Sequence, residues 1–343
     1  MQKLLLETLK GNPGDRVPFW FMRQAGRYLP EYREVRATTS SFMEFCYSPD
    51  KAAEVTLQPI RRYGMDGAIL FADILVVPDG LGQNVWFETG HGPKLTPVHD
   101  AATFAELSLA GFHDKVGPVY ETVARLKHAL APEVTLLGFA GAPWTVATYM
   151  VEGAGSKDHA AARQLGYRDP ALFGKLLDML VDATAAYLCR QIEAGADAVQ
   201  IFDSWAAALP ETVFEAWVIE PTRAIVDKIR REHPETPIIG FPRLSAAQYP
   251  HFVDATGVDA VSLDTGVPLD WARETLQSKV CVQGSLDPHL VVAGGKRMED
   301  EALRILDAFK GGPHVFNLGH GFVPQTPPEH VATLSELIKK YRR

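Results

Sequence analysis

Short apolar runs recur along the chain, and each is followed by a stretch with helical periodicity. Continuous apolar runs, as opposed to alternating ones, are typical of strands buried on both faces of a sheet. The segment VPFWFM (17–22) is also apolar and fits either a further strand or a lead-in to the first one. The seven clear runs are GAILFA (67–72), VTLLGFA (134–140), DAVQIF (197–202), TPIIGF (236–241), VDAVSL (258–263), KVCVQG (279–284) and HVFNLG (314–319).

The stretches between these runs predict helices. In the clearest case Asp169-Pro170 supplies a start signal and Gly195 a stop signal around an amphipathic segment. The N-terminal stretch predicts a short amphipathic helix that Gly11 and Pro13 end. The longer helical segments are 171–195, 215–233 and 298–312.

Strands that alternate with helices over the whole chain indicate an α/β protein with a parallel sheet. The spacing of the runs favours a (β/α)8 TIM barrel over a doubly wound sheet. No linker rich in proline or glycine divides the chain, so we predict one domain over residues 1–343. Residues 1–62 would form an N-terminal lead-in that carries an arginine-rich segment.

Composition excludes several classes of protein. The stretch MDGAILFADILVVPDGLG is interrupted by Asp66, Asp73 and Asp79, so it does not read as a membrane span. The first residues lack the long apolar run of a signal peptide. Three scattered cysteines without a CxxC pair fit free thiols in a reducing compartment. We therefore expect a cytoplasmic enzyme without a membrane partner.

Charge is distributed unevenly. The chain has a formal net charge of −8, yet residues 1–62 hold 10 Lys/Arg against 7 Asp/Glu. Without a broad basic surface we expect no nucleic-acid partner. A small anionic ligand near the N-terminal arginines remains open, because the local field matters more than total charge.

Polar residues follow most of the predicted strands. In a barrel of this kind, the residues that carry the chemistry lie at the C-terminal ends of the strands. Asp73 interrupts an apolar stretch, and a buried carboxylate needs compensating groups, which favours a functional role. His320 in NLGHGF fits either a turn or a site. Other polar groups at strand ends are Asp203, Ser204, Arg243, Asp264, Ser285 and Asp287; Asp264, Ser285 and Asp287 read best as helix N-caps.

The stretch MRQAGRYLPEYREVR (22–36) concentrates positive charge. A helical turn would place Arg23 and Arg27 on one face, in an otherwise apolar setting. Guanidinium groups bind carboxylate or phosphate in a bidentate manner, so a polyanionic substrate is the natural hypothesis. Arg33 and Arg36, beside Glu31 and Glu34, are typical of a solvated helix face with intrahelical ion pairs.

Five segments together resemble the uroporphyrinogen decarboxylase family, in order, from about residue 15 to 335. They are PFWFMRQAGRYLPEYRE, FADILVVPDGLG, GFAGAPWTVATYMVEG, QIFDSWA and NLGHGFVPQTPPEHV. The resemblance implies a single-domain barrel and a homodimer in tetrapyrrole biosynthesis. It also implies removal of CO2 from the four acetate side chains of uroporphyrinogen III, to give coproporphyrinogen III. No metal and no organic cofactor are implied.

The resemblance also implies roles for particular residues. Asp73 would accept hydrogen bonds from the pyrrole N–H groups and stabilise a cationic ring as charge develops. Arg23 would help in catalysis by delivering or relaying a proton, although an arginine is a poor acid. The substrate-binding residues implied are Arg23, Gln24, Ala25, Gly26, Arg27, Asp73, Tyr149, Ser204 and His320.

The sequence departs from the usual pattern of the family at three positions. Thr265 replaces a tryptophan, Ser285 replaces an asparagine, and a glycine is usual near Leu244. These departures bear on substrate contacts more than on the reaction class. Two alternatives remain: a zinc-dependent corrinoid:thiol methyltransferase of the same superfamily, which needs a His/Cys cluster, and a barrel that binds tetrapyrroles without turnover.

Overall fold

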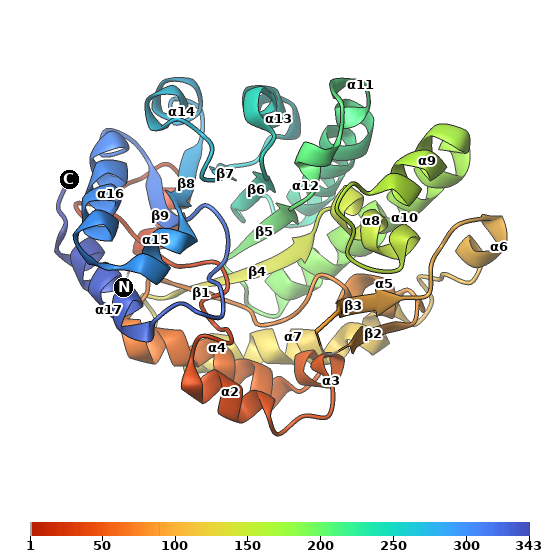
Figure 1. Cartoon of the computed structure of the whole chain (residues 1–343), viewed down its shortest axis with the longest axis horizontal. Helices are drawn as coiled ribbons and strands as arrows, with labels where there is room; N and C mark the ends of the chain where they lie inside the picture. The colour runs from red at the N-terminus through yellow and green to blue at the C-terminus, as the bar shows by residue number, and fades with distance from the viewer. Residues whose placement is uncertain (1, 89) are drawn as a thin grey trace.

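The computed structural model describes residues 2–88 and 90–343. Its centre is a curled sheet in which every neighbouring pair of strands is parallel, in the order β1-β4-β5-β6-β7-β8-β9. Helices surround this sheet (Figure 1). The strands are β1 (Gly67–Ile69), β4 (Thr135–Gly141), β5 (Ala198–Asp203), β6 (Ile238–Pro242), β7 (Ala260–Ser262), β8 (Cys281–Leu286) and β9 (His314–Leu318). All seven lie within the predicted runs or end within two residues of them, so the α/β barrel prediction is confirmed.

The apolar segment 17–22 occupies the gap between the two edge strands. Phe316 of β9 donates its N–H to the Pro18 carbonyl at 2.8 Å, and Phe19 forms a parallel bridge with Phe316. On the other side, Asp66, just before β1, donates its N–H to the Phe19 carbonyl at 3.0 Å. The segment therefore closes the barrel in the eighth position, although its pairing is too short to form a regular strand.

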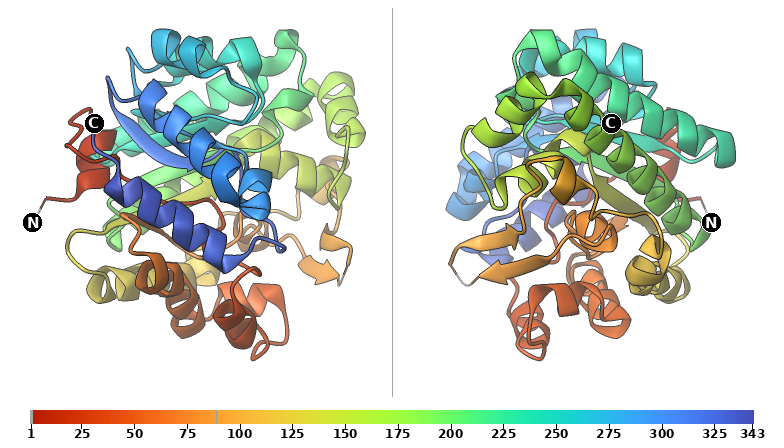
Figure 2. Two further views of the ribbon diagram at one scale, coloured as in Figure 1. Left: turned by 60° about the vertical axis from the view of Figure 1, so that its left-hand side comes forward. Right: turned by 90° about the vertical axis from the view of Figure 1, so that its right-hand side faces the viewer.

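The barrel interior is filled by side chains. Leu5 and Leu9 of α1 (Leu4–Leu9) belong to a buried apolar cluster with residues of the strands, and α1 lies at one end of the sheet (Figure 2). A buried polar network crosses the interior: Trp20 Nε1 donates to Gln283 Oε1 at 2.9 Å, and Gln283 Nε2 donates to Gln200 Oε1 at 3.0 Å. A filled interior leaves the C-terminal ends of the strands as the place for a site.

Most helices pack around the outside of the barrel. As predicted, Asp169 caps α10 by accepting a hydrogen bond from the Leu172 N–H. The helices are α2 (Pro30–Arg36), α3 (Phe42–Cys46), α4 (Pro49–Tyr63), α5 (Val76–Gly80), α6 (Ala101–Phe104), α7 (Phe112–Ala129), α8 (Pro143–Glu152), α9 (Ala160–Arg168), α10 (Pro170–Glu193), α11 (Glu211–Phe214), α12 (Glu220–Glu232), α13 (Tyr249–Thr256), α14 (Leu269–Thr275), α15 (Pro288–Ala293), α16 (Gly295–Ala308) and α17 (Pro328–Lys340), with the short turns η1 (Ala206–Ala208), η2 (Glu215–Ile219) and η3 (Ala246–Gln248).

Two features were not predicted. An antiparallel hairpin of β2 (Val85–Glu88) and β3 (Gly92–Leu95) stands beside the barrel (Figure 2). The predicted helix over 215–233 begins as a π-helical turn, η2, and becomes α-helical only at Glu220. In the described part of the chain, no helix is both long and apolar enough to cross a membrane.

Candidate active site at the C-terminal end of the barrel

The RQAGR segment is a series of turns, so the prediction that a helical turn aligns its two arginines is wrong. Arg23 has a φ of 60°, in the left-handed region. The buried Gln24 side chain accepts a hydrogen bond from the Phe21 N–H and donates one to the Gly67 carbonyl, both at 3.0 Å. Gln24 thus ties the segment to β1 and fixes the backbone that carries Arg23 and Arg27.

The two guanidinium groups of this segment are unpaired. Arg23 and Arg27 are exposed, and within residues 2–88 and 90–343 their side chains have no hydrogen-bond or ion-pair partner. Ala25 and Gly26 are only partly buried between them. A side chain at position 26 would bring its Cβ to 2.9 Å from the Arg23 carbonyl oxygen, so the turn requires glycine. Two free guanidinium groups so close in sequence suit a ligand with several carboxylates.

Arg33 and Arg36 differ from the expected ion pairs within one helix. Arg33 donates to the Arg27 carbonyl at 2.8 Å, and Arg36 donates to Thr39. Glu31 pairs instead with Arg62 of α4 at 3.0 Å. Arg33 therefore supports the backbone that carries Arg27.

Asp73 lies in the turn that follows β1. One oxygen, Oδ1, accepts a hydrogen bond from the Leu75 N–H at 2.9 Å; Oδ2 has no donor in the described part of the chain. Burial raises the pKa of Asp73, while the Leu75 N–H and Arg23 act in the opposite direction. A carboxylate with a free oxygen and a nearby cation can accept N–H groups of a ligand.

Tyr149 and Ser204 come from neighbouring βα units. Tyr149, on α8, is partly buried, and its pKa is raised by burial and by the nearby Asp73. Its ring centroid lies 6.3 Å from that of Trp205, which follows Ser204 at the end of β5. Tyr149 thus faces both Asp73 and the loop after β5.

His320 lies beside Arg23. The Phe322 N–H donates to the Met22 carbonyl at 3.0 Å, and the Arg23 side chain passes so close over Gly321 that a Cβ there would clash with it. Burial, Arg23 and Arg243 lower the pKa of His320 to about 3. The imidazole is therefore neutral at physiological pH and can both donate and accept a hydrogen bond.

Two strand-end residues that the sequence flagged without a role also belong to this end of the barrel. Asp203 Oδ1 accepts a hydrogen bond from the Thr145 hydroxyl at 2.5 Å, and its buried Oδ2 has no partner among the described residues. Burial raises the pKa of Asp203 to about 7. Arg243, after β6, is partly buried; it lies close enough to Arg23 for the two charges to repel each other, and its charge helps to lower the pKa of His320. In the sequence, the only sign that these two residues belong to a site was their position directly after a predicted strand.

Of the three residues expected to cap helices, the structure shows one in that role. Asp287 caps α15, as predicted. Ser285 lies inside β8 and Asp264 holds a loop, so neither caps a helix.

Two of the positions that depart from the expected family pattern lie in loops. Thr265 packs against Gly319, where a Cβ would lie 2.6 Å from Thr265 atoms. Leu244 is exposed and has a φ of 60°, a left-handed conformation that glycine adopts without strain.

Among the residues described here, one group has the spacing of metal ligands: Cys189, Glu232 and His233. These residues lie near the C-terminal ends of α10 and α12, which lead into β5 and β6. They therefore lie toward the N-terminal ends of the strands, opposite Asp73. This position gives no support to zinc-assisted methyl transfer at the C-terminal end.

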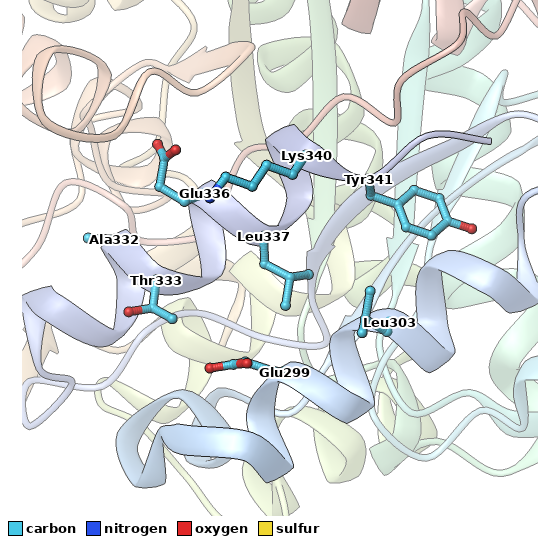
Figure 3. Close-up of a pocket in the computed structure, with 8 residues that line it drawn as sticks. All are labelled: Glu299, Leu303, Ala332, Thr333, Glu336, Leu337, Lys340 and Tyr341. Atoms are coloured by element: carbon cyan, nitrogen blue, oxygen red, sulfur yellow. The ribbon is translucent and has the colours of Figure 1, made fainter.

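A surface groove lies between α16 and α17, lined by Glu299, Leu303, Thr333 and Leu337 among others (Figure 3). None of the predicted site residues lines it. We place the candidate site at the C-terminal strand ends, where Arg23 lies near Asp73, Tyr149 and His320; Arg27 follows on the same turn.

Comparison with known proteins gives one consistent result. The family model described as "Uroporphyrinogen decarboxylase (URO-D)" matches residues 1–341. Uroporphyrinogen decarboxylase of Sphingopyxis alaskensis is 54% identical over 340 residues, covering 99% of this chain and 98% of the relative. That of Paracoccus denitrificans is 52% identical over 339 residues, covering 98% of this chain and 99% of the relative.

A solved structure shares the fold. A methyltransferase from Methanosarcina mazei superposes with a TM-score of 0.76 at 18% identity, covering 99% of both chains. At this identity the likeness concerns the architecture alone.

Proposed function

Because this chain belongs to the uroporphyrinogen decarboxylase family, we propose that it removes CO2 from the four acetate side chains of uroporphyrinogen III and produces coproporphyrinogen III. The enzyme would thus be a carboxy-lyase. The observation that carries the proposal is the match over the whole chain. The position of Asp73 beside the free Arg23 supports it.

Substrate binding would use the positive charge at this end of the barrel. Uroporphyrinogen carries eight carboxylates, and the unpaired Arg23 and Arg27 can each hold one in a bidentate manner. Ala25 and Gly26 keep the turn narrow, and Gln24 fixes it to β1. Tyr149, Ser204 and the neutral His320 would donate hydrogen bonds to further carboxylates.

The chemical step requires a sink for the electrons that the departing CO2 leaves behind. Protonation of a pyrrole carbon makes that ring cationic, and the C–CO2 bond then breaks toward the ring. A second proton converts the resulting methylene group to methyl, and loss of the first proton from the ring carbon restores the neutral pyrrole. Asp73 would hold the central pyrrole N–H groups through its free Oδ2 and stabilise the cation as it forms. Arg23, beside Asp73, would orient the acetate and take part in proton delivery, through a relay because a guanidinium group is a poor acid.

We further propose that the enzyme works as a cytoplasmic homodimer without metal or organic cofactor. Resemblance to the family supports the dimer and the cofactor-free chemistry. Three cysteines that are buried and unpaired support a reducing compartment.

The test is an anaerobic incubation of the purified protein with uroporphyrinogen III in the presence of a chelator. Products are oxidised and separated by the number of carboxylates. Successive appearance of porphyrins with seven, six, five and four carboxylates is expected. An unchanged eight-carboxylate peak would overturn the proposal and would favour the binding-only alternative; activity that the chelator abolishes would favour a metal enzyme.

A further inference from the structure

The residues after β6 form a rigid support for a third arginine. The Arg243 N–H is held by the Asp203 carbonyl at 3.1 Å and by the Phe241 carbonyl at 3.0 Å. The next N–H, of Leu244, donates to Asp264 Oδ2 at 2.8 Å. These bonds fix the backbone on both sides of the Arg243 side chain.

Asp264 holds this loop without pairing with Arg243. Its Oδ2 also accepts a hydrogen bond from the Tyr249 hydroxyl at 2.8 Å, and its Oδ1 accepts one from the Gly266 N–H at 2.8 Å. Asp264 is only 3% exposed. Both of its oxygens are thus occupied by the protein, and its charge reaches Arg243 only through space.

The Arg243 guanidinium has no anionic partner in the part of the chain that is described. Its Nε atom is buried without a hydrogen-bond acceptor. Burial lowers the pKa of Arg243, Asp264 and Tyr249 raise it, and Arg23 lowers it again. A partly buried cation that faces a second cation is unfavourable unless an anion lies between or beside them.

We propose that Arg243 is a further carboxylate-binding residue, which holds one carboxylate of the substrate together with Arg23 and His320. The inference rests on the proposed function, because it takes a tetrapyrrole polycarboxylate as the ligand. Arg23 comes from the segment that closes the barrel, Arg243 from the end of β6 and His320 from the end of β9. Three elements far apart in the sequence thus contribute to one anion subsite.

The experiment compares Arg243→Gln and Arg243→Lys with wild type and with Arg231→Gln. Arg231 is exposed on the outer helix α12 and serves as the matched control. Binding of oxidised uroporphyrin is measured by fluorescence titration, uroporphyrinogen turnover gives kcat and KM, and thermal unfolding gives Tm. Charged hydrogen bonds of this kind predict that Arg243→Gln raises Kd and KM by about tenfold or more, while kcat stays within about threefold. Arg243→Lys should be intermediate, because it keeps the charge and loses the bidentate fork.

Two results would overturn the inference. One is unchanged Kd and KM in Arg243→Gln, whether or not its Tm falls, since Arg243 would then make no contribution to substrate binding. The other is a fall in kcat with Kd and KM unchanged. Failure of wild type to turn over uroporphyrinogen would refute the proposed function separately, and the porphyrin titration would still decide the role of Arg243.

Discussion

Asp203 makes stability depend on pH in a direction that is unusual for a carboxylate. It is buried at the end of β5 and receives one hydrogen bond from Thr145, and its second oxygen has no partner in the part of the chain that is described. Its pKa is raised to about 7, chiefly by burial. A group whose pKa is raised on folding contributes stability that is present below its ordinary pKa and is lost as pH rises through the raised value.

The size of the effect follows from the two pKa values. With 3.8 for the ordinary carboxyl and about 7 in the folded chain, ionisation costs about 4 kcal/mol more in the folded state. Integration of proton uptake over both states predicts a loss of about 2.5 kcal/mol of unfolding free energy between pH 5 and pH 8 from this group alone. Asp203→Asn keeps the shape and cannot ionise, so it should remove that loss.

The measurement is urea denaturation of wild type and Asp203→Asn at intervals from pH 5 to pH 8. As pH rises, the unfolding free energy of wild type should fall relative to that of Asp203→Asn. Asp178→Asn, at an exposed position on α10, should run parallel to wild type. Parallel curves for wild type and Asp203→Asn would show that Asp203 does not titrate between pH 5 and pH 8, and the pKa of about 7 on which the prediction rests would be refuted.

Three further predictions concern the site. Asp73→Asn keeps the shape and removes the charge that stabilises the cationic ring, so kcat should fall about a hundredfold or more with little change in KM; near-normal kcat contradicts this role. Leu244→Gly should raise the unfolding free energy in urea by about 1 kcal/mol because it relieves a left-handed φ, whereas Leu109→Gly, also exposed, should give no gain. His320→Asn should raise KM but leave the pH dependence of kcat/KM between pH 6 and pH 8 unchanged, because burial and two arginines hold the pKa of His320 near 3; loss of an inflection in that range would refute this.

The sequence predicted the strands well because each is buried on both faces and therefore reads as a continuous apolar run. Long helices with clear ends, such as α10, were predicted for the same kind of reason: Asp169 and Gly195 are strong local signals. The polar residues after the strands were found by position alone. Asp73 and His320 could therefore be predicted from the apolar runs that precede them, together with the rule that active sites of barrels lie at the C-terminal ends of the strands.

Long-range contacts explain what the sequence did not predict. The turns around Arg23 are set by the bonds of Gln24 to β1 and by the loop after β9, which no local pattern records. The raised pKa of Asp203 and the missing partner of Arg243 depend on burial among residues from other strands. The β2–β3 hairpin contains Gly92 and Pro93, which weaken a strand signal.

Closure of the barrel by residues 17–22 also bears on synthesis of the chain. The contact of Phe19 with Phe316 joins positions near the two ends of the sequence, so most of the protein must leave the ribosome before this contact can form. Until then, the apolar segment from Val17 to Met22 has no partner on its β9 side and is available to chaperones. Because Arg23 follows that segment directly, the ligand-binding end is completed only when the last strand arrives. Capacity to bind porphyrin should therefore appear late in translation, after β9 has emerged.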